Sequence, residues 1–177
     1  MKEANEAHPF GYGKSRYVFA FIVSVVLFTV GGMFSIYEGI DKLTHPHELE
    51  NAWVPLVVLA IAIVLESFSL RTAVVESRKV KGNQTWIGFI KRAKAPELPV
   101  VLLEDLAALA GLAIAFVAVG LSVVTGNPVF DAIGTLLIGL LLVVVAIILG
   151  FEMGSLLIGE GVTTEDLVII KSALIAT

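Results

Sequence analysis

No cysteine occurs among the 177 residues, and charged residues make up only 16% of the chain. The lack of cysteine excludes disulfides and thiolate metal sites. The low charge is unusual, because soluble domains carry about 25% charged residues. Residues 1–6 are polar and partly acidic, and no apolar region follows them directly, so they do not predict a signal peptide. Hydrophobic residues make up 57% of the chain and the mean hydropathy is +0.93, which indicates a membrane protein.

The apolar residues are concentrated in blocks that contain almost no charge. These blocks are Val18–Phe34, Trp53–Leu65, Val100–Val124 and Ile133–Leu149. Roughly 18 or more such residues cross a hydrocarbon core as a helix, and the second block reaches that length only by continuing past Glu66 to Leu70. We therefore predict an all-α membrane protein with about four transmembrane helices. They cover residues 17–37, 53–73, 99–124 and 130–151, with an extension of the last helix to 158 left open.

Basic residues are unevenly distributed among the segments that flank these helices. Those before the first helix are Lys2, Lys14 and Arg16. Those between the second and third helices are Arg78, Lys79, Lys81, Lys91, Arg92 and Lys94. The connection between the first and second helices has only Lys42 among several acids, and the last connection has no basic residue. Because basic loops face the cytoplasm, we predict that both ends of the chain are cytoplasmic.

Small residues recur at the spacing of helix-packing contacts. They are Gly31, Ser35 and Gly39 in the first helix, Ala107, Gly111 and Ala115 in the third, and Thr135 and Gly139 in the fourth. Such residues let helix backbones approach closely in lipid, so we predict a packed bundle. The alternative is the ordinary enrichment of glycine and alanine in membrane helices.

Three regions follow from the pattern: a cytoplasmic loop over residues 1–16, a transmembrane domain over 17–160, and the start of a cytoplasmic domain over 161–177. In the last region, Thr163 and Asp166 resemble a capping box. Leu167, Ile170 and Leu174 then share one helical face. This apolar face needs a partner that residues 161–177 do not supply, so we expect a truncated domain.

Carboxylates within the predicted membrane helices are the strongest candidates for chemistry, because a charge there costs at least about 2.5–3.5 kcal/mol. Glu104 and Asp105 lie early in the third helix. Adjacent helical residues point about 100° apart, so one acid should face the bundle interior and the other a neighbouring helix or a water-filled vestibule. We predict coupling to a metal ion or a proton. Pairing with Lys94 or Arg92 at the membrane interface is the alternative.

Other acids are less decisive. Glu66 is the deepest isolated acid of the second helix, and both an ion or proton relay and a structural pair with Arg71 stay open. Asp131 opens the fourth helix, where the helix dipole favours a carboxylate, so its role is open between stability and function. Glu38 and Glu152 lie near helix ends and are interpreted as interfacial.

The histidines give weak signals. His45, His47 and Glu48 surround a proline in the outer loop, where they either capture a divalent metal or simply form a connection. His8 begins a glycine-rich run to Lys14 that lacks the spacing of a phosphate loop. The sequence contains no nucleophile–base arrangement and no protease motif, so we do not expect an enzyme.

Three segments resemble the cation diffusion facilitator family. The run HPFGYGK at 8–14 is similar to the cytoplasmic loop after that family's second membrane helix. The runs LEDLAA at 103–108 and GNPVFD at 126–131, with Gly134 and Gly139, are similar to its fifth and sixth helices. The similarity keeps the order of the family over nearly the whole chain and is greatest for the zinc transporter nine-like branch.

The resemblance implies a dimeric transporter that exports divalent cations, typically zinc, in exchange for protons. The family has six membrane helices and a cytoplasmic ferredoxin-like domain, and this chain matches the third to sixth helices. The two helices that it does not match would carry half of the family's metal site. The implied partners are membrane lipid, a second copy of the chain, a divalent cation and protons, without nucleic acid. The implied location is a membrane, which is the cell membrane if the source is prokaryotic.

The metal residues are also implied by the resemblance, with one departure. Asp105 matches the aspartate of the family's fifth-helix His-x-x-x-Asp motif, but Val101 occupies the histidine position. Glu104 is then the substitute ligand, and an oxygen-rich site favours harder cations, so manganese or iron is an alternative to zinc. His8 matches one histidine of a loop metal site, whereas Tyr12 replaces the second. The alternative function is a non-transporting membrane scaffold or regulatory subunit.

Overall fold

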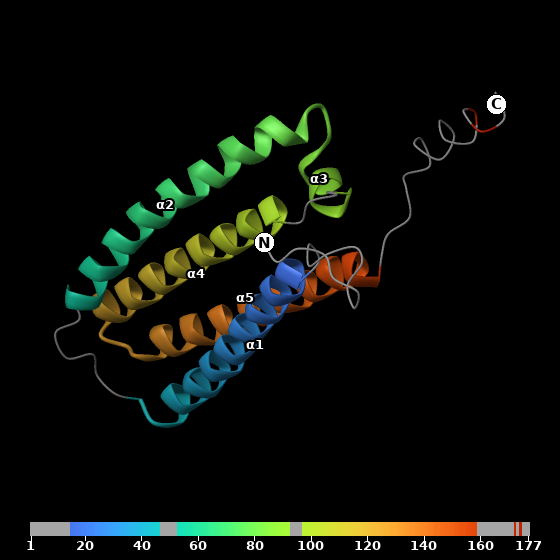
Figure 1. Cartoon of the computed structure of the whole chain (residues 1–177). Helices are drawn as coiled ribbons and strands as arrows, with labels where there is room; N and C mark the ends of the chain where they lie inside the picture. Colours follow the sequence, from blue (N-terminus) through green and yellow to red (C-terminus); the bar gives the residue numbers. More distant parts are fainter. Residues whose placement is uncertain (1–14, 47–52, 93–96, 159–171, 173, 175–177) are drawn as a thin grey trace.

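The computed structural model describes residues 15–46, 53–92, 97–158, 172 and 174. Over these residues the chain forms four long helices and one short helix, with no strand in the described part. In chain order they are α1 (Ser15–Thr44), α2 (Trp53–Lys81), α3 (Trp86–Arg92), α4 (Glu97–Thr125) and α5 (Val129–Ile158). The long helices lie side by side, with α2 along α4 and α1 along α5 (Figure 1). Contacts between α4 and α5 join the two pairs.

Four of these helices are long and apolar enough to cross a bilayer, as the sequence predicts. The candidate spans are Ile22–Thr44, Trp53–Lys81, Leu98–Thr125 and Val129–Phe151. Many of their large apolar side chains point outward, which suits a helix that is surrounded by lipid. The chain is therefore an integral membrane protein that passes through the bilayer several times.

The residues of the turn between α4 and α5 end one helix and begin the next. Gly126 has a φ of +66°, a left-handed conformation that glycine adopts without strain and that ends α4. Asn127 then caps α5, since its Oδ1 accepts a hydrogen bond of 3.0 Å from the N–H of Val129. Pro128 occupies the first turn, where its missing N–H costs nothing. The two helices are thus antiparallel neighbours.

The predicted helix ends were too short, because hydropathy detects the membrane rather than the helix. α1 continues from the predicted end at residue 37 to Thr44, and α2 continues from residue 73 to Lys81. α4 begins at Glu97, before the predicted start at Pro99. Polar pairs one turn apart, such as Glu38 with Lys42, support the helix where the apolar run stops. The short helix α3 was not predicted.

Close packing between α1 and α5 depends on glycine. A Cβ added to Gly32 would lie 3.1 Å from the carbonyl oxygen of Gly139, and one added to Gly39 would lie 2.6 Å from Cγ of Leu136. The predicted packing roles of Gly39 and Gly139 are therefore confirmed. Gly31 makes only an ordinary contact. The prediction for Gly111 is wrong within the described chain, because a Cβ there would meet nothing within 4 Å.

A small apolar cluster forms where α4, α5 and α1 meet. Its members are Val100, Ala107, Val145 and Leu149, with Phe28, Leu103 and Leu141 packed against them. Leu149 is fully buried. Glu104 lies between two of these positions on α4, so the cluster fixes the backbone from which the acidic side chains project.

Candidate cation site

Glu104 and Asp105 are adjacent on α4, and the structure turns them toward different helices. The hydroxyl of Ser24 on α1 donates a hydrogen bond to Oε1 of Glu104. The hydroxyl of Ser69 on α2 donates a hydrogen bond of 2.9 Å to Oδ2 of Asp105. The divergence follows from the angle of about 100° between successive helical side chains. The acids therefore do not form one shared pair of ligands.

The environments of the two acids also differ. Ser24, the partner of Glu104, is only 6% exposed and lies inside the bundle. Ser69, the partner of Asp105, is exposed in this chain. With a rise of 1.5 Å per residue, Asp105 lies about 10 Å along α4 from the start of its span at Leu98. Both acids therefore lie within the candidate span of α4, nearer the end at which the helix begins.

Glu66 lies on α2, the helix whose Ser69 bonds to Asp105. It lies three residues before Ser69 on α2, so both project from the same side of that helix. The hydrogen bond from Ser69 to Asp105 therefore places Glu66 about one helical turn from the contact between α2 and α4. The described residues contain no ion pair between Glu66 and Arg71, the structural partner that the sequence leaves open. Two carboxylates near one contact between candidate membrane helices favour the binding of a proton or a cation.

The described part of the chain does not supply a complete metal site. It contains no group of three or more histidine, cysteine, aspartate or glutamate side chains that could hold a metal ion. Of the predicted ligands, Asp105 lies where α4 contacts α2, the helix that carries Glu66, whereas Glu104 bonds to α1. His8 lies outside the described residues. Val101 lies one turn before Asp105 and is exposed, so this position is open to other partners.

Asp131 lies at the other end of the bundle in a different arrangement. Its Oδ2 is 3.0 Å from Nζ of Lys42, which also lies 3.1 Å from Oε1 of Glu38. Lys42 donates a further hydrogen bond of 3.3 Å to the hydroxyl of Thr135. Asp131 is in the first turn of α5, as predicted, and it additionally pairs with α1. This pair was not predicted, although Lys42 is the only lysine or arginine between the first two helices as the sequence predicts them.

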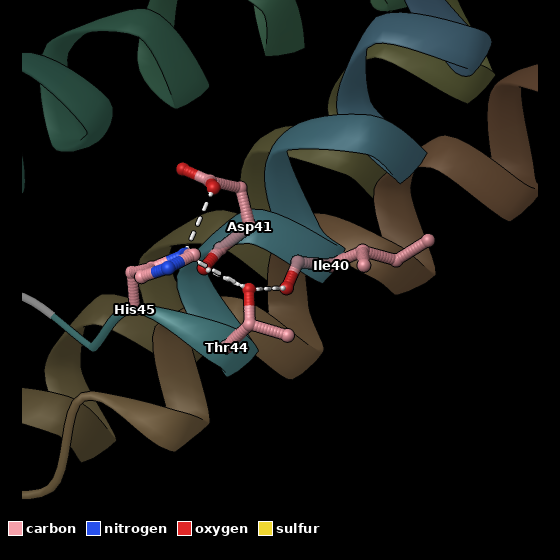
Figure 2. Close-up of polar contacts among 4 residues, drawn as sticks. All are labelled: Ile40, Asp41, Thr44 and His45. Atoms are coloured by element: carbon pink, nitrogen blue, oxygen red, sulfur yellow. Dashed lines mark hydrogen bonds and ion pairs between the residues drawn. The ribbon is translucent and has the colours of Figure 1, made fainter.

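His45 belongs to the end of α1 (Figure 2). Its Nδ1 lies 3.2 Å from Oδ1 of Asp41 and 3.1 Å from the hydroxyl of Thr44. The Thr44 hydroxyl also donates a hydrogen bond of 3.1 Å to the carbonyl of Ile40. These contacts complete the last turn of the helix. His47 and Glu48, the other candidates in this loop, lie outside the described residues.

Comparisons with known proteins all indicate the same family. The model of the cation efflux transmembrane domain matches residues 1–158. The chain is 35% identical over 169 residues to the mouse protein "Proton-coupled zinc antiporter SLC30A9, mitochondrial", covering 94% of this chain and 30% of the relative. The human protein of the same name is 34% identical, with the same coverage. Metal tolerance protein C4 of Arabidopsis thaliana is 34% identical over 162 residues, covering 90% of this chain and 35% of the relative.

These matches identify the family and show how much of the relatives' sequences the chain covers. The chain spans about a third of the length of these curated relatives. No solved structure matches it with significance. The family model covers most of the chain and includes all four candidate spans. The chain therefore belongs to the cation diffusion facilitator family, whose transmembrane domain carries out cation efflux.

Proposed function

We propose that the protein exports a divalent metal cation, zinc first, in exchange for protons, and that Asp105 binds the cation during transport. The observation that carries this proposal is the hydrogen bond from Ser69 on α2 to Asp105 on α4, within two candidate membrane spans and one helical turn from Glu66. The names of the relatives, which include a proton-coupled zinc antiporter and a metal tolerance protein, support the same class of cargo.

In this proposal the carboxylates exchange protons for the cation. When a divalent cation reaches Asp105 and Glu66, it binds to their carboxylates in place of protons. The Ser69 hydroxyl holds one carboxylate oxygen of Asp105 and leaves the other free to bind the cation. Return of protons from the opposite side then releases the cation. Glu104 is assigned a neighbouring role, in which its bond to Ser24 links the site to α1.

The ligand chemistry decides which cations fit. Asp105, Glu66 and Ser69 offer only oxygen atoms, and Val101 supplies no imidazole at the preceding turn. Oxygen ligands favour harder cations such as manganese over zinc. We propose zinc as the first cargo on the strength of the relatives, with manganese and iron as competitors. His8 remains a predicted additional ligand from the cytoplasmic loop.

Transport in proteoliposomes tests the function directly. We expect a proton gradient to drive zinc uptake by the purified protein, and Asp105→Asn to abolish it while helix content is retained. Glu76→Gln is the matched control, because Glu76 is an exposed acid near the end of α2 that pairs only with Lys79 in the described chain. Unchanged transport by Asp105→Asn would remove Asp105 from the site.

The alternative function is a non-transporting scaffold or regulatory subunit. The observation that favours it is the lack of a three-ligand metal group in the described residues. Calorimetric titration with zinc separates the two functions. A transporter should bind zinc in a manner that depends on Asp105, whereas a scaffold should bind none and show no uptake with any of the three cations.

We further propose that both chain ends face the cytoplasm and that the protein is a homodimer. The absence of cysteine allows single thiols to be introduced without background labelling. Cysteine at the exposed positions His45 and Asn83 should report opposite sides of the membrane. We expect an impermeant reagent to label His45→Cys but not Asn83→Cys in intact cells, and chemical crosslinking to yield a dimer. The reverse labelling would invert the topology.

A further inference from the structure

A basic stretch connects α2 to α4 and contains no compensating acid. Between Glu76 and Glu97 the sequence has six basic residues and no acidic residue. The structure describes the end of α2 at Lys81, the turn at Gly82 and the helix α3 within this stretch.

The helix α3 is fixed to the bundle by one face. Phe89 is only 3% exposed, and the adjacent ring of Trp86 meets it edge to face with the ring centroids 6.5 Å apart. The hydroxyl of Thr85 accepts a hydrogen bond of 3.1 Å from the N–H of Gly88, which supports the first turn of the helix. On the opposite side, Ile87 is 68% exposed. Thus α3 presents a fixed apolar residue to its surroundings.

The position of α3 places this surface at the membrane boundary. The span of α2 ends at Lys81 and the span of α4 begins at Leu98, so the segment between them lies at one edge of the bilayer. Figure 1 shows α3 beside the start of α4, close to the bundle. Tryptophan favours the level of the lipid headgroups, where its ring is apolar and its N–H is polar. A tryptophan next to the end of a candidate span is therefore suited to the headgroup region.

The last turn of α2, which precedes α3, carries positive charges at Arg78, Lys79 and Lys81. Lys79 is neutralised in part by Glu76, with their side-chain atoms 2.6 Å apart. Arg78 is exposed and forms no ion pair with any residue that the structure describes. Nζ of Lys81 lies 5.3 Å from the centre of the Trp86 ring, so its charge is held next to the tryptophan. A partner at this level must bring negative charge together with apolar contact.

We propose that Arg78, Lys81, Trp86 and Ile87 form a docking surface for anionic phospholipid headgroups, hereafter the α3 surface. An anionic phospholipid meets both requirements, since its phosphate pairs with Arg78 and Lys81 while its upper acyl chain contacts Ile87. Basic clusters next to a membrane span attract anionic lipids in this way. The surface selects lipids by headgroup charge, independently of which cation the protein carries.

Quenching of Trp86 fluorescence tests this selection without any transport assay. The chain has only two tryptophans, so Trp53→Phe leaves Trp86 as the single reporter. The purified chain is reconstituted in vesicles that contain equal fractions of phosphatidylcholine and phosphatidylglycerol. In one preparation the phosphatidylcholine carries bromine on its acyl chains, and in the other the phosphatidylglycerol does. We expect brominated phosphatidylglycerol to quench Trp86 roughly two-fold more than brominated phosphatidylcholine.

Charge variants identify the cause. Arg78→Gln with Lys81→Gln should remove the preference, whereas Arg78→Lys with Lys81→Arg should keep it. Raising the salt to about 1 M, where the screening length falls to about 3 Å, should weaken the preference in the parent chain. Circular dichroism checks that each variant keeps its helix content. Equal quenching by the two brominated lipids, or a preference that survives loss of both charges, would overturn the proposal.

Discussion

Ser24 on α1 donates a hydrogen bond to the carboxylate of Glu104 on α4, across 80 positions of sequence. The next residue, Asp105, accepts its bond from Ser69 on α2. Two neighbouring acids thus connect one helix to two different partners. Any movement of α2 relative to α1 must change at least one of these bonds, so the acids are placed to link a cation at Asp105 to the arrangement of the bundle.

The bond from Ser24 should stabilise the bundle. Ser24→Ala leaves the Glu104 carboxylate without this donor in a partly buried place, and we expect a loss of about 1–3 kcal/mol in the free energy of unfolding. Once Glu104 is changed to alanine, the additional loss from Ser24→Ala should be small. Unfolding of the two single variants and the double variant in lipid nanodiscs measures this coupling. Strictly additive losses would mean that the two side chains act independently.

Ser69 should affect the cation more than the fold. Ser69→Ala removes the donor that orients Asp105, and we expect the zinc affinity to fall roughly two- to ten-fold, since a typical hydrogen bond contributes about 0.5–1.5 kcal/mol. Ser67→Ala is the matched control, because the Ser67 hydroxyl donates to its own helix at the carbonyl of Ile63, 2.6 Å away. Calorimetric titration compares the variants. Equal affinity in both would remove Ser69 from the site.

Lys42 and Asp131 should contribute to the contact between α1 and α5. The Asp131 side chain is 14% exposed and that of Lys42 is 32% exposed, so their ion pair is only partly screened by water. We expect a double-mutant cycle of Lys42→Met and Asp131→Asn to give a coupling of roughly 1 kcal/mol in thermal unfolding. Zinc affinity should be unchanged, because the pair lies at the opposite end from Asp105. A large loss of zinc binding would place Asp131 in the cation path.

The sequence was sufficient for the spans, but not for the partners of the acids within them. Long apolar runs predict membrane helices because the bilayer imposes that length. Serine is common in such helices and has no periodic signal, so the partners Ser24 and Ser69 could be identified only from the fold. Helix α3 was missed because its seven residues are too few to show helical periodicity. The pair of Lys42 with Asp131 was missed because it depends on how α1 packs against α5.

Glycine substitutions test the packing on which the whole arrangement depends. Gly139→Ala would place a Cβ 2.8 Å from the backbone N of Ile36 and 2.7 Å from its Cγ1, so α1 and α5 must separate. We expect a loss of about 1–3 kcal/mol, the usual cost of overpacking. Gly111→Ala is the matched control, because its Cβ would meet nothing within 4 Å of the described chain, and alanine favours the helix by up to about 1 kcal/mol. Thermal unfolding in the same lipid measures both variants. Should Gly111→Ala be the more damaging change, α4 must pack there against a second copy of the chain or another segment, and crosslinking from that position would identify which.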